Sequence, residues 1–385
     1  MISFSISIHF TPDNQSITTF LTLGTQTIRQ MKINKISLHI EDFDLTRPYE
    51  VAYVKHEAVQ NYVLVIETDK HVGIGTGSPS EHVTGEIIPA DSSHREDEIS
   101  GLLLQQDIRS FKHLILKASQ EFAKSPALLA AVDMALHDLF CRHIGVHISS
   151  YLGVNVKPLT TSITIGIKSL DETLAEGREY IERGFKAIKL KIGSDYESDL
   201  EKYLKLREAT PSDIVIRVDA NQGFATHQLK SFILATQDQP VEFFEQPFPK
   251  GDYELMRYLD TVVRSMCCAD EDCQKMSDAA KLSIRPLPYG IFNIKLMKSG
   301  GITEAIRIAD VALLNQIHLM WGCMDESCVS IAAALNTAYS CPQTRYIDLD
   351  GSFDLSKDIA RGGFYIKDGI LYPDLTNDGL SVELI

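Results

Sequence analysis

The sequence lacks an excess of basic residues: 37 Lys and Arg stand against 52 Asp and Glu, which gives a formal net charge of −15. Nucleic-acid binders draw their non-specific affinity from Lys and Arg patches, so this balance argues against a nucleic-acid partner. Long blocks of like charge are also missing, and hydrophobic residues make up 44% of the chain. Such a composition is typical of a compact globular protein rather than a disordered one.

No run of 18 apolar residues occurs, so we expect no membrane span. The first thirty residues lack the basic and unbroken apolar regions of a secretory signal. The seven cysteines are odd in number and include no CxxC pair, and the cluster Cys267-Cys268-x4-Cys273 has no partnering His motif. These absences argue against a disulfide framework and a zinc site, and they favour a cytoplasmic protein.

Two regions precede the main periodic part of the chain. Residues 1–30 are rich in Ser and Thr with almost no charge, and we interpret them as an N-terminal extension or as a wrongly chosen start before Met31. Residues 31–155 combine β-branched runs, which predict an antiparallel meander, with the helical pattern LLAAVDMALHDLF at 128–140. Strands followed by helices predict an α+β domain here.

Residues 156–354 carry eight short β-branched runs, centred near 164, 189, 217, 244, 268, 294, 321 and 347. Amphipathic segments such as LDETLAEGREYIERG separate the runs. This regular spacing predicts an α/β fold built as a (β/α)8-type barrel. We expect the eighth unit to end early and residues 355–385 to return to the first domain. The predicted architecture is therefore a barrel with an α+β capping domain formed by the N-terminal segment and the C-terminal tail.

Charged residues stand at the carboxyl ends of successive strand runs, where the active sites of such barrels lie. Asp219, Glu245 and Asp270 follow three consecutive runs. Three neighbouring carboxylates need a cation, and oxygen ligands with room for water and substrate suit Mg2+. Lys191 and Lys295 follow the flanking runs, opposite each other around the barrel. Nearby cations lower the pKa of a lysine, so each lysine is expected to be a usable general base.

These residues lie in motifs that resemble the enolase superfamily, in its muconate-lactonising-enzyme subgroup. The motifs are KLK at 189–191, VDANQGF at 218–224, EQPFP at 245–249, ADE at 269–271 and NIKLMKSGG at 293–301, with TGE at 84–86 in the capping region. The resemblance covers about residues 31–385. It implies that Mg2+ holds a substrate carboxylate while a lysine removes the adjacent α-proton to give an enediolate.

The eighth run indicates which members of this subgroup the chain resembles most. IDLDG places Asp348 and Asp350 two residues apart, on one strand face, like the DxD motif of dipeptide epimerases. There the two carboxylates would hold the free α-ammonium group of a dipeptide. Lys191 and Lys295 would then invert the α-carbon of the C-terminal residue by two-base 1,1-proton transfer, and Lys189 would stabilise the carboxylate. A helix-capping role for the two aspartates stays open.

The resemblance also implies supporting roles. Asn221, Glu271 and Asn293 would orient the groups that bind the metal and substrate, and Thr164 on the first strand would contact substrate. As in relatives of this kind, we expect a symmetric homo-oligomer.

Substrate choice depends on two further positions. Ala-Glu epimerases carry a loop arginine where this chain has Val54, with Lys55 beside it. Asp325, in WGCMDES after the seventh run, favours a cationic partner, so we predict a dipeptide with Lys or Arg in one or both positions. A salt bridge from Asp325 to a protein Arg is the alternative.

Several other functions stay open at this point. They are an Ala-Glu or hydrophobic dipeptide epimerase, an o-succinylbenzoate synthase or N-succinylamino-acid racemase, a muconate cycloisomerase, and a non-catalytic barrel that binds small peptides. An acid-sugar dehydratase is less favoured because we find no leaving-group His after the seventh run.

Overall fold

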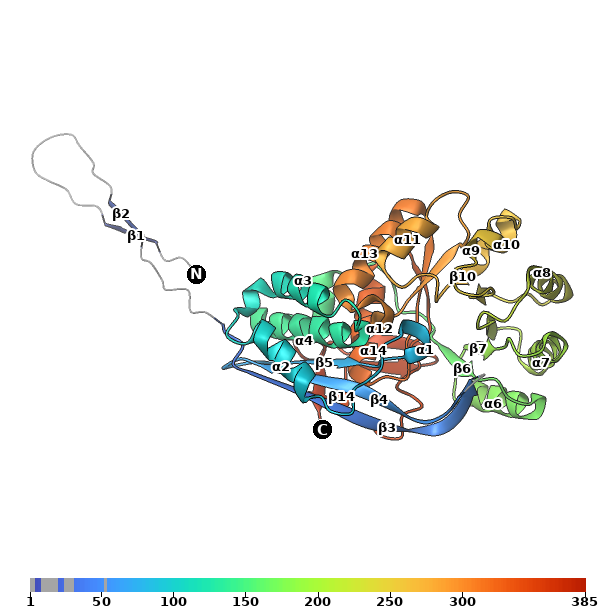
Figure 1. Ribbon diagram of the computed structural model, residues 1–385, viewed down its shortest axis with the longest axis horizontal. Coiled ribbons are helices and arrows are strands. Elements are labelled where there is room, and N and C mark those ends of the chain that lie inside the picture. The colour runs from blue at the N-terminus through green and yellow to red at the C-terminus, as the bar shows by residue number, and fades with distance from the viewer. Residues whose placement is uncertain (1–3, 8–19, 24–30, 52–53) are drawn as a thin grey trace, which may run out of the picture.

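The computed structural model describes residues 4–7, 20–23, 31–51 and 54–385, and of residues 4–7, 20–23, 48–51 and 54–57 only the backbone. Figure 1 shows a barrel on one side and a group of antiparallel strands and helices on the other. None of the helices in the described ranges is long and apolar enough to cross a membrane. The prediction of residues 1–30 as an extension falls mostly outside these ranges, within which β1 (Phe4–Ser7) and β2 (Phe20–Leu23) pair antiparallel.

The capping domain consists of a three-stranded antiparallel sheet and the helices packed on it. The strands follow each other in the order β3 (Lys35–Val51), β4 (Val54–Glu67) and β5 (Val72–Gly77). The helices are α1 (Glu81–Thr84), α2 (Ser93–Leu103), the 3-10 turn η1 (Ile108–Ser110), α3 (Phe111–Glu121), α4 (Pro126–Ile144) and α5 (Ile148–Leu152).

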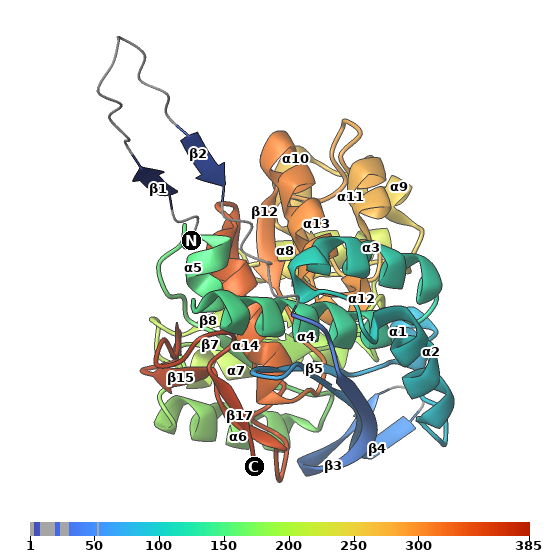
Figure 2. The ribbon, with the colours of Figure 1, turned by 90° about the vertical axis from the view of Figure 1, so that its left-hand side faces the viewer.

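Helix α4 lies directly on strand β5, and the sequence of the strand explains why. Gly73, Gly75 and Gly77 alternate along β5 and face the helix, and a Cβ added at Gly75 would overlap the carbonyl oxygen of Ala131. Only glycine permits so close an approach of two backbones. Helix α4 lies between the sheet and the barrel (Figure 2), and almost all of its residues are therefore buried.

The barrel contains eight parallel strands in sequence order, as predicted. Thr161 forms a parallel bridge with Ile347, which brings the first strand next to the last. The strands are β6 (Ser162–Ile165), β7 (Ala187–Lys191), β8 (Val215–Asp219), β9 (Phe244–Glu245), β10 (Cys267–Ala269), β11 (Ile291–Ile294), β12 (His318–Trp321) and β13 (Thr344–Ile347). Each contains or adjoins the centre predicted from the spacing.

Helices connect the first seven strands to the next and cover the outside of the barrel (Figure 1). They are α6 (Leu170–Glu182), α7 (Tyr196–Ala209), α8 (Thr226–Ala235), α9 (Tyr253–Met256), α10 (Thr261–Ser265), α11 (Met276–Leu282), α12 (Leu296–Ser299), α13 (Ile302–Asn315) and α14 (Cys328–Ser340). No helix among the described residues follows β13, so the eighth unit ends early, as expected.

The C-terminal tail returns to the capping domain. It forms two hairpin-like pairs, β14 (Ala360–Gly362) with β17 (Val382–Leu384) and β15 (Phe364–Lys367) with β16 (Ile370–Pro373). Asp138 of α4 accepts a 2.7 Å hydrogen bond from the Leu380 N–H, and Arg142 donates to the carbonyl oxygen of Val382 at 2.9 Å. The predicted fold class, a barrel capped by N-terminal and C-terminal segments, is confirmed.

Candidate active site

The predicted site residues meet at the carboxyl ends of the barrel strands. The parallel register places Lys191 of β7 beside Asp219 of β8, and Asp219 beside Glu245 of β9. Asp270 follows directly after β10, and Lys295 directly after β11. Strand order and register therefore bring together side chains that are about 100 residues apart along the chain.

Lys189 lies at the centre of this group and is almost completely buried. Its Nζ is 3.1 Å from Asp219 Oδ2, 2.8 Å from Glu245 Oε2 and 3.0 Å from Asp348 Oδ2. Burial lowers the pKa of Lys189, but the three carboxylates outweigh burial and hold the pKa well above its ordinary value. Lys189 is therefore a fixed positive charge between acidic residues from β8, β9 and the segment after β13.

Asp270 binds two lysines. Its Oδ2 accepts from Lys295 Nζ at 2.9 Å, while Lys298 donates to its Oδ1 and, at 2.6 Å, to its backbone oxygen. Burial raises the pKa of Asp270, but the lysines lower it far more. Lys298, which also donates to the Asn293 carbonyl at 3.0 Å, was not predicted as a site residue. Its position one helical turn after Lys295 was the available signal.

The pKa of Lys295 does not follow the expectation drawn from the sequence. Burial lowers this pKa and Lys189 lowers it too, but Asp270 and Glu245 raise it above the ordinary value. The reason is distance, because the Asp270 carboxylate is in direct contact with the ammonium group. In this arrangement Lys295 holds its proton. A usable base requires that the negative charge of Asp270 be neutralised by another cation.

The polar neighbours of the carboxylates hold them in place. Asn293 donates from Nδ2 to Glu245 Oε1 at 2.7 Å, and the backbone N–H of Asn221 donates to Asp219 Oδ1 at 3.0 Å. Gln222 donates to Glu271 Oε1 at 3.2 Å. The contact from Asn221 comes from its main chain, at a residue in the left-handed region with φ of 44°. Asn221 thus supports Asp219 through local backbone geometry.

Gln246 adds a support that the sequence reasoning missed. Its side-chain oxygen accepts from the Asp270 N–H at 2.9 Å, and its side-chain nitrogen donates to Asp272 at 3.0 Å. Gln246 is fully buried and follows Glu245 directly. One residue therefore links the strand ends that carry Glu245 and Asp270.

The chemistry of the donor set fits a hard divalent cation. Asp219, Glu245 and Asp270 are buried carboxylates at the ends of consecutive strands. Burial and the neighbouring Asp219 and Asp270 raise the pKa of Glu245 to about 8, although Lys189 lowers it. No three acidic, His or Cys side chains of the described residues already converge as a metal-binding group. Lysine ammonium groups contact all three carboxylates.

Asp348 and Asp350 lie directly after β13, at the carboxyl end of the barrel. Ser162 donates to Asp348 Oδ1 at 2.6 Å, and the backbone N–H of Thr164 donates to Asp350 Oδ2 at 2.8 Å. Burial and Asp348 together raise the pKa of Asp350 to about 7. None of the helices in the described ranges begins at either aspartate, so neither caps a helix. Thr164 contributes its backbone rather than its hydroxyl.

Asp325 and Glu326 lie in the loop between β12 and α14. The capping domain holds this loop: Ser78 donates to the Asp325 carbonyl oxygen at 2.9 Å, and Asn61 donates to it at 3.3 Å. Glu326 is buried with Oε2 lacking a hydrogen bond, and burial raises its pKa to about 8. The side chains of Val54 and Lys55, whose loop position bears on substrate choice, lie outside the described residues.

The cluster Cys267-Cys268-Cys273 is not part of this site. The three thiols are buried in and after β10, and all seven cysteines are free. Burial raises the pKa of the Cys267 and Cys268 thiols, which disfavours the thiolate that a metal would need.

Comparisons with known proteins agree with this geometry. Residues 172–385 match the family described as enolase C-terminal domain-like. The chain is 46% identical over 340 residues to the L-Lys-D/L-Arg epimerase of Desulforapulum autotrophicum, covering 88% of this chain and 96% of that protein. It is 44% identical over 342 residues to the L-Lys-D/L-Arg epimerase of Methylococcus capsulatus, covering 89% and 96%.

A solved structure shows the same arrangement of the whole chain. It is the dipeptide epimerase from Methylococcus capsulatus in complex with Mg and the dipeptide L-Arg-D-Lys, with a TM-score of 0.89 and 43% identity. The match covers 91% of this chain and 99% of that one. Together with the barrel, its capping domain and the acidic and lysine residues at the strand ends, these matches establish that the chain belongs to the enolase superfamily.

Proposed function

We propose that this protein is a Mg2+-dependent epimerase that inverts the α-carbon of the C-terminal residue of cationic dipeptides. The observation that carries the proposal is that two lysines lie on opposite sides of the carboxyl end of the barrel. Lys191 ends the second strand and Lys295 follows the sixth, with Asp219, Glu245 and Asp270 on the strands between them. Two bases on opposite faces of one carbon are what inversion by proton transfer requires.

The residues divide the work as follows. Asp219, Glu245 and Asp270 would hold Mg2+, whose positive charge would acidify the proton on the carbon next to the substrate carboxylate and would offset the carboxylates that raise the pKa of Lys295. One lysine removes the α-proton, and the other returns a proton to the opposite face. Lys189 stabilises the negative charge that develops on the carboxylate oxygens. Asn221, Glu271 and Asn293 keep the acidic side chains in position.

The two aspartates of the DxD motif would bind the amino-terminal end of the dipeptide. Asp348, which contacts Lys189, and Asp350 follow directly after β13 and would bind the free α-ammonium group of the dipeptide. This arrangement distinguishes a dipeptide from N-succinyl or lactone substrates, which have no ammonium group there. It also argues against a barrel that only binds peptides, since binding does not require two bases.

The preference for Lys or Arg rests on the acidic loop after β12. Asp325 is held by Ser78 and Asn61 of the capping domain, and Glu326 is buried beside it. The L-Lys-D/L-Arg epimerases among the relatives support a cationic side chain as the partner of this loop. Ala-Glu and hydrophobic dipeptides are the alternative substrates.

The test is deuterium incorporation from D2O with Mg2+ and a pooled library of L,L-dipeptides, read by mass spectrometry. We expect exchange at the C-terminal α-carbon, strongest for peptides containing Lys or Arg. Exchange confined to Ala-Glu or apolar peptides would contradict the cationic preference, and no exchange with any dipeptide would contradict the epimerase.

A lysine variant makes this test sharper. Lys191→Met and Lys295→Met should each abolish inversion, and each should still exchange the α-proton of the one epimer that faces the remaining lysine. Lys281→Met, which removes an exposed lysine from α11, is the matched control and should behave like the natural protein.

Two properties complete the proposal. We expect a symmetric homo-oligomer, which light scattering of the purified protein measures directly, and a cytoplasmic location, which fractionation of the source cells measures.

A further inference from the structure

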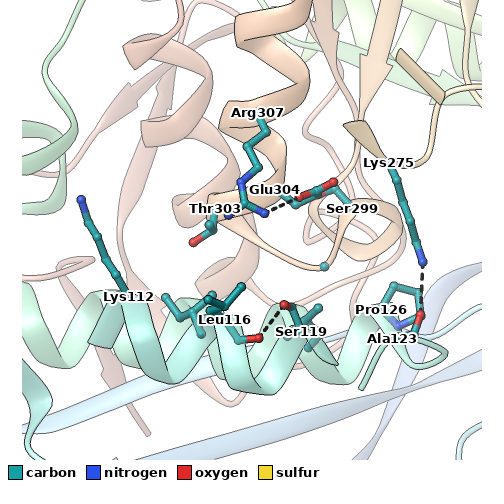
Figure 3. A pocket seen from close by; sticks show the side chains of 13 residues that line it. Lys112, Leu116, Ser119, Ala123, Pro126, Lys275, Ser299, Thr303, Glu304 and Arg307 are labelled. Atoms are coloured by element: carbon teal, nitrogen blue, oxygen red, sulfur yellow. Dashed lines mark hydrogen bonds and ion pairs between the residues drawn. The ribbon is translucent and has the colours of Figure 1, made fainter. Parts of the chain in front are cut away.

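A groove separate from the barrel mouth lies where the capping domain meets the barrel. One wall comes from α3 and the start of α4, and the other from the end of α12 and the first turns of α13 (Figure 3). The cavity has a volume of about 220 Å³. It is lined by Lys112, Ile115, Leu116, Ser119, Ala123, Pro126, Leu129, Lys275, Ser299, Gly300, Thr303, Glu304 and Arg307.

The lining has an apolar wall and a cationic rim. Ile115, Leu116 and Leu129 contribute aliphatic side chains, and Leu116 is 46% exposed. Ile115 and Leu129 are buried behind it. Ligand pockets are concave and lined mainly by apolar side chains, with a few polar groups. In Figure 3, Lys112 stands at one end of the groove and Lys275 at the other, with Arg307 above the wall between them.

The positive charge at this groove is unusual for a chain with a net charge of −15. Among the described residues that line it, Glu304 is the one acid, and both of its oxygens are engaged. Oε2 accepts from Arg307 at 3.0 Å, and Oε1 accepts from the Met276 N–H at 3.0 Å. Lys112 and Lys275 therefore set the charge that a ligand meets at either end of the groove, which favours an anion.

We propose that this groove binds a small amphipathic carboxylate, with its apolar body on α3 and α4 and its carboxylate on Lys275. The volume lies below the range of about 300–1,000 Å³ that holds drug-sized ligands, so the occupant is a short chain or a single ring. Lys275 donates to the carbonyl of Ala123, a residue of the groove lining, at 3.1 Å, and an ammonium group has three donors. The ammonium group of Lys112 instead lies over the rings of Phe111 and Tyr151, which do not line the groove.

The groove also adjoins the segment that carries the site lysines. Ser299 and Gly300 line it, while Lys295 and Lys298, in the same turn of chain, contact Asp270 on the other side. Gly300 has a φ of 88° and packs so closely on Leu129 that any side chain there would overlap it. A ligand against Ser299 and Gly300 consequently restrains the segment 295–301, and through it the positions of both lysines.

Isothermal titration calorimetry with octanoate tests the site directly, using octylamine as the control of opposite charge. We expect octanoate to bind the natural protein and octylamine not to. Lys275→Glu should weaken octanoate binding by about tenfold, since it reverses the charge next to the carboxylate, and Lys112→Glu, at the other end of the groove, should weaken it less. Lys117→Glu, an exposed change on the same helix that does not line the groove, should leave binding unchanged.

A fourth variant is designed to block the groove without changing its charge. Ser119 is half-buried in the wall, and Ser119→Trp should fill the cavity and abolish octanoate binding. Octanoate binding that is equal in all four variants would place the carboxylate elsewhere, including the barrel mouth, and would overturn the proposal. Octylamine binding as tightly as octanoate would overturn it as well.

The link to the lysine segment has its own readout, which does not depend on catalysis. Hydrogen–deuterium exchange mass spectrometry should show slower amide exchange in peptides covering residues 295–303 of the natural protein when octanoate is bound, and no slowing by octanoate in Ser119→Trp. Unchanged exchange in this segment at saturating octanoate would contradict the link.

Discussion

Asp133, in helix α4 of the capping domain, accepts a 2.7 Å hydrogen bond from the backbone N–H of Ile302, the first residue of barrel helix α13. The first N–H groups of a helix have no partner within the helix, and a carboxylate there also interacts favourably with the helix dipole. The bond lies immediately after the segment that carries Lys295 and Lys298. The capping domain therefore supports the barrel at the point where the site lysines are attached.

Asp133→Ala should lower the free energy of unfolding by about 1–3 kcal/mol, because it leaves buried N–H groups at the start of α13 without an acceptor. Urea unfolding measures this. Asp133→Asn keeps a side-chain oxygen and should lose less. Equal stability of the two variants would contradict the capping role.

Asp350→Asn should raise the KM for dipeptides by about tenfold or more and change kcat less, since it weakens a charge-assisted hydrogen bond to the substrate ammonium group. Steady-state kinetics with a dipeptide and with its N-acetylated form test this. The N-acetylated form has no ammonium group, so its weaker turnover should be insensitive to the substitution. A similar loss with both substrates would argue that Asp350 only supports the fold.

Lys298→Met should destabilise the protein by about 3–5 kcal/mol, because removing one member of a buried ion pair leaves the other without compensation. Lys298 contacts the carboxylate and carbonyl of Asp270 as well as the Asn293 carbonyl. Thermal unfolding with and without Mg2+ is the measurement. Lys281→Met serves as the exposed control, and an unchanged Tm for Lys298→Met would contradict this assignment.

Glu86 links stability to pH. Burial raises its pKa to about 7, although the N–H groups of Ala127 and Leu128 and the charge of Arg95 lower it. Between the ordinary pKa of a glutamate and about pH 7, Glu86 is therefore protonated in the folded protein and ionised in the unfolded chain. Its contribution to stability is complete below the ordinary pKa of a glutamate and is lost as the pH rises through about 7.

Glu86→Gln should remove this dependence. The stability of the natural protein minus that of the variant should fall by up to about 1.4 kcal/mol per pH unit across this window. Chemical unfolding at a series of pH values measures the difference, and Glu81→Gln, at an exposed position in α1, is the control. A difference that rises with pH would contradict the burial argument.

Much of the candidate site was predictable because strand spacing and residue type carry the information. Asp219, Glu245 and Asp270 follow three consecutive strand runs, and parallel strands place their carboxyl ends together. The residues that hold these carboxylates in position were harder to predict from the sequence. The contacts of Asn221 and Thr164 come from backbone N–H groups, and those of Gln246 and Lys298 depend on how the segment after β9 and helix α12 are placed against Asp270. No spacing rule specifies these orientations.

The pKa of Lys295 also shows the difference between what the sequence predicts and what the folded structure decides. Its nearness to other cations was inferred from strand order, and that inference predicted a lowered pKa. The Asp270 carboxylate at 2.9 Å reverses the sign. Electrostatic energy depends on distances of a few ångströms, which strand order does not provide.

The sequence by itself determined the barrel, its cap, the family and the set of acidic and lysine residues at the strand ends, because hydrophobic periodicity and strand-end charges are local patterns. Only the tertiary structure decided which groups pair within the site, how Asp133 joins the two domains, and that a cationic groove lies between α3 and α13. The last two features combine segments more than 150 residues apart along the chain, and all three depend on packing that exists only in the folded protein.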